Sequence, residues 1–119
     1  LVPRTDGDGN DIAGVRAPDV AAPLATHTGF NVRKAGFAEG QLCGLNGSYL
    51  PFSNDAQERA AKRDPRPSLA ERYGTQAAYV QRVRASAEQL RSEGLMLDED
   101  VARSLELAAK DPAVQSLAK

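Results

Sequence analysis

Tryptophan is absent from this sequence, and cysteine, histidine and methionine occur once each. Aromatic residues make up only 5% of the 119 residues, and much of the 41% hydrophobic share is alanine. Alanine buries little surface, and buried apolar surface contributes about 25 cal/mol per Å² to folding. A single thiol also excludes an internal disulfide. The composition therefore predicts a thin core, which packing against a neighbouring part of a larger protein would complete.

An excess of charge of either sign is also missing, because 15 basic residues face 16 acidic ones and the net charge is −1. Nucleic-acid-binding domains need a clustered excess of Lys and Arg, whereas the basic residues here are scattered along expected helices. A membrane-spanning helix needs about 20 consecutive apolar residues, and no run approaches that length. We therefore expect neither nucleic acid nor a membrane as a partner.

Glycine and proline divide the chain into two parts near residue 52. Most of them fall within residues 1–52, where helical periodicity is weak. Residues 53–119 are charged and carry the i, i+4, i+8 apolar spacing of helices. The sequence thus predicts a mainly α-helical chain with an irregular, β-hairpin-containing N-terminal part.

The N-terminal part is expected to begin with a β-hairpin over residues 1–16. Its strands would lie at about 1–5 and 12–16, around a turn rich in Asp, Gly and Asn, which tolerate the backbone angles of tight turns. Residues 17–52 hold three prolines and several glycines and are expected to be extended. A segment of this length without regular structure is unusual in a compact domain, so we expect it to wrap another part of the protein.

The helical part ends in two long helices, expected at about 76–92 and 98–110. Their short connection predicts an antiparallel αα-hairpin over about 76–110, with Leu95 and Leu97 plugging its end. Shorter helices are expected before and after this pair. The residues predicted to cap helix N-termini are Ser53 or Asn54, Ser68, Thr75, Asp98 and Asp111.

His27 is the only histidine, and it lies in a loop between two threonines. The general base of a Ser-His-Asp triad is a histidine beside the nucleophile, and in many hydrolases it is the last triad member in the chain. His27 is therefore a candidate catalytic residue. The alternative is a loop histidine that hydrogen-bonds to the backbone and packs.

Other reactive side chains fit structural roles better. Ser48 lacks the flanking glycines of a Gly-x-Ser-x-Gly nucleophile elbow, and no other serine in the chain has them. Cys43 is expected to be a small buried apolar residue. No Gly-rich phosphate loop occurs, and one His with one Cys falls short of a zinc site. We therefore expect no cofactor and no metal.

Asp6, Asp8 and Asn10 repeat the opening rhythm of a calcium-binding loop. The pattern then fails, because Asp11 stands where the loop needs glycine and Ala17 where it needs glutamate. A polar hairpin turn is the preferred interpretation, with calcium binding as the alternative.

Seven arginines fall within residues 53–92, and glutamates stand near them. Exposed Arg–Glu pairs three or four residues apart are typical of a solvated helix surface. We expect that role for them, with a patch for an anionic partner as the alternative. The arginines are Arg59, Arg63, Arg66, Arg72, Arg82, Arg84 and Arg91.

A series of segments in fixed order is more specific than any single motif. The segments are 8–18, 20–31, 40–48, 51–52, 64–74 and 79–80. In this order they resemble the C-terminal region of a bacterial family of α/β-hydrolase domain-containing proteins. The resemblance spans nearly the whole chain, from about Leu1 to Ala109.

The resemblance implies a longer parent protein with an α/β-hydrolase fold, whose nucleophilic serine lies upstream of residue 1. Residues 1–52 would drape over the hydrolase core, and Thr26, Thr28 and Asn31 would approach the substrate pocket. Family members often carry another residue at the position of His27, which implies that the triad base is upstream too. The expected partner is the remainder of the parent chain.

Two functions of different classes follow. In the first, the chain is the C-terminal segment of a serine hydrolase acting on ester bonds, and it contributes packing and part of the substrate pocket. In the second, the αα-hairpin is a stand-alone module that binds a partner helix or peptide through the apolar stripe of Tyr79, Val80, Val83 and Leu90.

Overall fold

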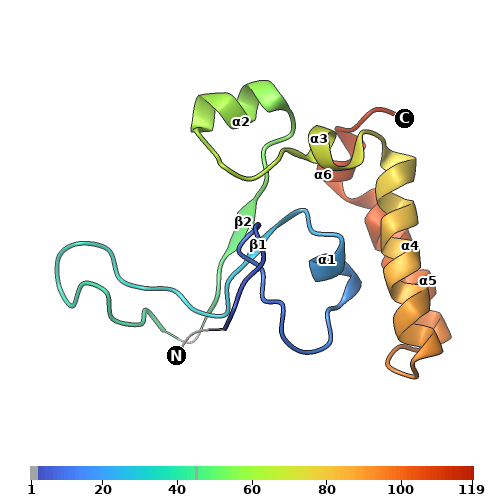
Figure 1. The fold of residues 1–119 in the computed structure, drawn as a ribbon, viewed down its shortest axis with the longest axis horizontal. Helices are drawn as coiled ribbons and strands as arrows, with labels where there is room; N and C mark the ends of the chain where they lie inside the picture. Colours follow the sequence, from blue (N-terminus) through green and yellow to red (C-terminus); the bar gives the residue numbers. More distant parts are fainter. Residues whose placement is uncertain (1–2, 45) are drawn as a thin grey trace.

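Six helices and one two-stranded antiparallel sheet make up the fold in the computed structural model, which describes residues 3–44 and 46–119 (Figure 1). This confirms the expected fold class. In chain order the elements are α1 (Pro18–Ala21), β1 (Ala25–His27), β2 (Tyr49–Pro51), α2 (Ala56–Lys62), α3 (Leu69–Tyr73), α4 (Gln76–Ser92), α5 (Asp98–Lys110) and α6 (Pro112–Gln115). No helix within the described ranges is long and apolar enough to span a bilayer.

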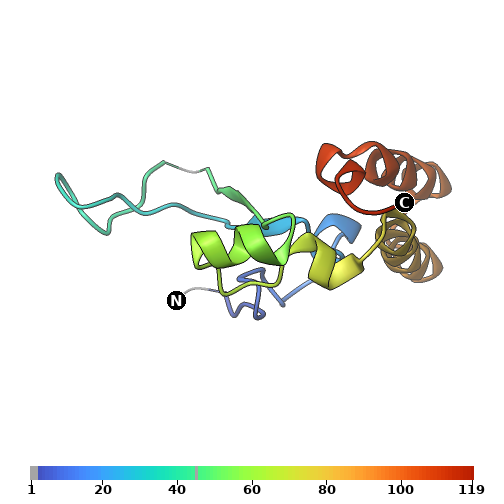
Figure 2. The ribbon, with the colours of Figure 1, turned by 90° about the horizontal axis from the view of Figure 1, so that it is seen from above.

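Helices α4 and α5 pack side by side along most of their length, as both views show (Figures 1 and 2). Thr75 caps α4 by accepting a hydrogen bond from the Ala78 amide, as expected. Gly94 follows α4 with φ 75°, a left-handed conformation that glycine adopts at little cost. The expected plug of the turn is wrong, because Leu95 and Leu97 are 55% and 61% exposed.

The N-caps of the other helices depend on which side chain reaches the free amides. Ser68 forms the expected capping box with Glu71 at the start of α3, and Asp111 caps α6. Asp55, rather than Ser53 or Asn54, caps α2 by accepting from the Glu58 amide. The residue at the cap position of α5 is Leu97, and Asp98 is the first residue inside the helix. There its carboxylate is placed to stabilise the helix dipole.

The sheet pairs β1 with β2, so that Ala25 lies opposite Pro51 and His27 opposite Tyr49. The hairpin expected over residues 1–16 is reduced to a tight turn with a single bridge between Thr5 and Asp11. No strand forms over residues 12–16, while residues 1–2 of the expected first strand lie outside the described part. The turn forms because the Asp6 carboxylate accepts hydrogen bonds from the backbone amides of Asp8 and Asn10, which follow it in the chain.

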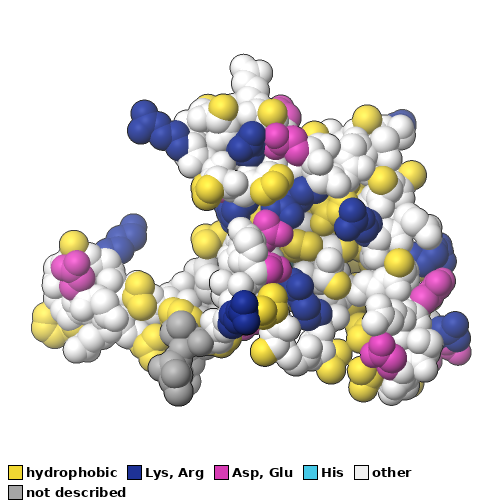
Figure 3. Space-filling view, viewed as in Figure 1, with side chains coloured by type: hydrophobic (Ala, Val, Ile, Leu, Met, Phe, Trp, Pro, Cys, Tyr) yellow, Lys and Arg dark blue, Asp and Glu magenta, His cyan; other side chains and the backbone are white. Residues whose placement is uncertain are grey.

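Between the two strands the chain extends away from the body as an arm, residues 29–44 and 46–47 (Figure 1, left). A bridge between Val32 and Leu42 joins its two sides. Hydrophobic side chains on the arm remain uncovered, and Phe37 is 92% exposed (Figure 3). The radius of gyration is 16.0 Å, against roughly 13–14 Å for a compact domain of this length. The protein is therefore open in shape.

The core is small and lies where α1, α3, α4, α5 and α6 meet. Its members come from both sides of the boundary predicted near residue 52, and the division into two parts stays a prediction. Tyr79 and Val83 are buried in it and Val80 packs against it, so the stripe proposed to bind a partner helix is occupied by the protein itself. The buried cluster is Ala22, Leu24, Phe52, Leu69, Tyr79, Val83, Ala108, Val114 and Leu117.

Two of the seven arginines differ from the solvated role expected for them. Arg66 and Arg72 lie against the ring of buried Phe52, with their Cζ atoms 5.0 and 4.0 Å from its centroid. Arg66 pairs with Asp64 at 2.6 Å, and Arg72 pairs with Asp8. These contacts fasten the strands and the N-terminal turn to the helices. Arg59 and Arg84 do pair with glutamates on the surface, as expected.

Cys43 is exposed on the arm, so the expectation that it is buried is wrong. Its apolar neighbour Leu42 is 61% exposed, and no part of the chain that the structure describes covers either residue. The apolar neighbours of Cys43 in the sequence predicted that it is buried, but the arm extends away from the core and leaves it exposed.

Candidate functional site

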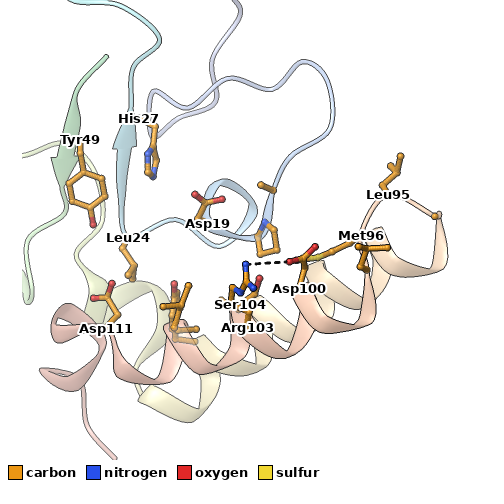
Figure 4. Close-up of a pocket in the computed structure, with 18 residues that line it drawn as sticks. Asp19, Leu24, His27, Tyr49, Leu95, Met96, Asp100, Arg103, Ser104 and Asp111 are labelled. Atoms are coloured by element: carbon orange, nitrogen blue, oxygen red, sulfur yellow. Dashed lines mark ion pairs between the residues drawn. The ribbon is translucent and has the colours of Figure 1, made fainter. Parts of the chain in front are cut away.

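An open groove of about 690 Å³ runs between α5 on one side and α1 with the β1–β2 pair on the other (Figure 4). This volume falls within the range of small-molecule binding sites. His27, the only histidine of the sequence, is among the residues that line this groove. The groove is therefore the candidate functional site.

The floor of the groove is the edge of the core. Leu24, Tyr79 and Val83 contribute buried side chains to it. Along α5 its wall carries Leu97, at the α4–α5 turn, and Leu107, one helical turn before Asp111; these side chains are 61% and 64% exposed. Exposed leucines along a concave surface favour an apolar occupant, because covering them removes apolar surface from water.

Polar side chains gather at the other end of the groove. The rings of His27 and Tyr49 meet edge to face, with centroids 5.3 Å apart. The carboxylates of Asp19 and Asp111 project toward the same hollow (Figure 4). Burial raises the pKa of Tyr49, and the negative charge of Asp111 raises it further.

The negative charges of Asp111 and Asp19 also act on Tyr79, which is buried at the floor of the groove. Burial is the main reason why its pKa is raised, and the charges of Asp111 and Asp19 act in the same direction. Both phenols therefore stay neutral hydrogen-bonding groups at physiological pH.

His27 is held in place by Asn10, a residue that is fully buried. The Asn10 Oδ1 atom accepts a hydrogen bond from the His27 amide at 2.7 Å, and its Nδ2 atom donates to the Ala25 carbonyl at 3.1 Å. The side-chain amide thus pairs with the free edge of β1 as a neighbouring strand would. No hydrogen bond from a described residue reaches the His27 imidazole, although a triad base needs an orienting carboxylate.

The residues expected to join His27 at a substrate pocket lie outside the groove. The Thr26 hydroxyl donates to the Asp8 carbonyl and accepts from Arg66 at 2.8 Å. The Thr28 hydroxyl accepts from the Ser48 amide at 2.8 Å. Asn31 donates to the Asn46 carbonyl and accepts from the Ser48 hydroxyl. All three side chains serve to hold the strands and the base of the arm.

The geometry of the N-terminal turn disfavours the calcium interpretation, because protein groups occupy the oxygens that a calcium ion would need. Asp6 pairs with Arg16 at 2.7 Å, and Asp8 pairs with Arg72. The Asn10 oxygen binds the His27 amide. Among the residues that the structure describes, no group of three or more His, Cys, Asp or Glu is placed to hold a metal ion.

Sequence reasoning missed four residues of the site, namely Asn10, Asp19, Tyr49 and Asp111. Asp111 was predicted only as a helix cap, and Asp19 lies in the segment that was expected to be extended but forms the short helix α1. Tyr49 could have been found only through the β1–β2 register, which places it opposite His27. Asn10 carried a signal in the Asp-Gly-Asp-Gly-Asn turn, although a turn does not specify a bond 17 residues away.

Comparison with known proteins places these features in a family. A family model described as an alpha/beta hydrolase domain matches residues 2–106. This confirms the family predicted from the series of motifs. The matched range includes His27, Tyr49 and Asp19, while Leu107 and Asp111 follow it. No curated protein and no solved structure matches the chain.

Proposed function

Because the chain belongs to the alpha/beta hydrolase domain family, we propose that it is the C-terminal segment of a serine hydrolase acting on ester bonds. In this proposal the segment supplies packing and one wall of the substrate pocket. The nucleophile and its base belong to the remainder of the parent protein. The family match over most of the chain is the observation that carries the proposal.

The open shape of the protein supports a role in packing. The arm carries uncovered side chains at Phe30, Val32, Phe37 and Leu42. Patches of this kind mark surfaces that other protein covers. The hydrogen bonds across the arm, from the Arg33 amide to Gln41 and from the Cys43 amide to Asn31, keep it a defined shape that can fit a neighbouring surface.

The groove supports a role in the substrate pocket. It combines an apolar floor with a few polar groups at one end, which is the usual make-up of a ligand site. His27 lines it, yet no described carboxylate holds the imidazole in the orientation of a general base. We therefore assign His27 to the wall of the pocket, where it contacts substrate.

Hydrolysis of p-nitrophenyl octanoate by the parent protein that contains this segment tests this proposal. Leu107→Lys places a charge on the apolar wall and is expected to raise KM several-fold, because it lowers the affinity for the octyl chain. Val15→Lys, at a position equally exposed but outside the groove, serves as the matched control. Absence of hydrolysis, or equal effects of the two variants, would contradict the proposal.

The His27→Ala variant separates the two roles of the histidine. A wall residue is expected to change KM while kcat stays within about tenfold, whereas loss of a general base lowers kcat by about 10²–10⁴-fold. A loss of that size would move the base into this segment and overturn the assignment of His27 to the wall.

A further inference from the structure

The two carboxylates at the polar end of the groove come from different elements and make no ion pair within the described residues. Asp19 belongs to α1, and Asp111 lies between α5 and α6. The Asp111 Oδ1 atom accepts one hydrogen bond, from the Ala113 amide at 2.8 Å. Both carboxylates line the same groove, as do Tyr49 and Tyr79.

The charges that line the groove do not balance. The lining contains three aspartates and one arginine. The arginine, Arg103, pairs with Asp100 on the part of α5 nearer the α4–α5 turn, with 3.8 Å between its Nη1 atom and the Asp100 Oδ1 atom. Asp19 and Asp111 are therefore left without a partner beside Tyr49 and His27. Two uncompensated carboxylates next to an apolar floor disfavour an anion there and favour a cation.

The aromatic and apolar groups define what kind of cation fits. The ring of Tyr49 is 55% exposed and lies beside His27. Faces of such rings attract ammonium groups, most strongly those that carry alkyl groups and little bound water. The wall at Leu97 and Leu107 can cover an attached apolar chain. A strongly hydrated metal ion would gain nothing from these two leucines.

From this arrangement we propose that the groove binds an organic cation with an apolar tail, an alkylammonium group, with the ammonium between Asp19 and Asp111 and the tail along α5. The inference deepens the proposed function, because it names the substrate class as an ester that bears an alkylammonium group. It rests on the proposed function only for the ester bond, since the binding itself needs no catalysis.

Calorimetric titration with octyltrimethylammonium and with octanoate tests the inference without any hydrolysis. The two probes share an octyl chain and differ in the sign of the head group. We expect the cation to bind at least about tenfold more tightly than the anion, and the preference to shrink with added salt because screening weakens the attraction. Failure of the cation to bind, or equal or tighter binding of octanoate, would overturn the inference.

The Asp19→Asn/Asp111→Asn variant removes both charges and keeps the side-chain shapes, and asparagine still caps α6. We expect its preference for the cation to fall to within about twofold. The Glu99→Gln/Glu106→Gln variant makes the same change in net charge on the exposed face of α5 and should keep the preference. Asp19→Asn alone, at an exposed side chain of α1, is expected to give an intermediate preference. An unchanged preference in both aspartate variants would refute the site, whereas loss of ester hydrolysis with binding intact would affect the proposed function alone.

Discussion

Arg72 and Asp8 stand 64 positions apart in the chain and form a two-point ion pair. The Arg72 Nη1 atom donates to one carboxylate oxygen of Asp8 at 2.7 Å, and Nη2 donates to the other. The same guanidinium covers the ring of Phe52. The pair therefore joins the N-terminal turn to α3 across a core residue, and it fixes the turn that carries Asn10.

Removal of this guanidinium should destabilise the protein markedly. Arg72→Met retains the contact with Phe52 but leaves the Asp8 carboxylate, which is 19% exposed, without its partner. We expect the free energy of unfolding in urea to fall by about 2 kcal/mol, less than for a fully buried pair because water reaches both groups. Arg84→Met, at a surface pair with Glu88, should cost less than about 0.5 kcal/mol. Equal losses in the two variants would contradict the role of the pair.

A double-mutant cycle isolates the interaction itself. Asp8→Asn combined with Arg72→Met should be destabilised by less than the sum of the single variants, with a coupling of about 1–2 kcal/mol. Additive effects would show that the two side chains stabilise the protein independently.

Asp64 should make the stability fall at low pH. The hydrogen bonds and charge of Arg66 lower the pKa of Asp64 from 3.8 to about 2. Because the carboxyl binds its proton less tightly in the folded protein than in the unfolded one, its contribution is complete above about pH 4 and is lost as the pH falls toward 2. Asp6, Glu58 and Glu71 also have lowered pKa values and add to the decline.

Urea unfolding between pH 2 and pH 5 measures that contribution by difference. In Asp64→Asn the decline should be smaller than in the unaltered protein, because one of its causes has been removed. Glu39→Gln, at an exposed side chain on the arm that makes no ion pair with a described residue, should leave the profile unchanged. A profile in Asp64→Asn that is parallel to that of the unaltered protein would show that the Arg66 contact does not act on stability.

Asn10 should be far more sensitive than an exposed asparagine. Asn10→Ala removes the two side-chain hydrogen bonds to β1 and leaves the His27 amide and the Ala25 carbonyl unpaired. We expect the free energy of unfolding to fall by about 2–3 kcal/mol. Asn46→Ala changes an exposed side chain and should cost less than about 0.5 kcal/mol. Thermal unfolding provides the comparison, and a small effect of Asn10→Ala would mean that water replaces the lost hydrogen bonds.

Alanine substitutions at Gly47 and Gly29 test how closely the two sides of the arm approach each other at its base. A Cβ atom on Gly47 would lie 1.6 Å from the Thr28 carbonyl oxygen, whereas one on Gly29 would meet nothing within 4 Å. Gly47→Ala must therefore displace the backbone and weaken the bond from the Thr28 amide to the Ser48 carbonyl. Hydrogen exchange at the Thr28 amide should accelerate about tenfold or more, with no such change in Gly29→Ala. Equal exchange rates in the two variants would contradict the close approach.

Local signals in the sequence predicted the helices well, because their determinants lie within a few residues of one another. The spacing of Tyr79, Val83 and Ala87 predicted α4, and Ser68 with Glu71 predicted the capping box of α3. Both rest on contacts between neighbouring turns of the chain.

Contacts between distant residues could not be predicted in the same way. The pairing of β1 with β2 joins segments more than 20 residues apart and places Tyr49 beside His27. Arg72 looked like a surface residue, since nothing near it in the sequence indicates Asp8 as its partner. The groove arises where these distant contacts meet, so His27 was a candidate from its chemistry alone.

The central claim is that this segment belongs to a serine ester hydrolase and lacks the nucleophile. Labelling of the enzyme with a fluorophosphonate, followed by peptide mapping in a mass spectrometer, tests it most directly, because the reagent bonds to the activated serine. The account predicts one labelled serine, located outside these 119 residues, and loss of ester hydrolysis in proportion to labelling. A label on Ser48 or on any other serine of this sequence, or hydrolysis that survives complete labelling, would contradict it.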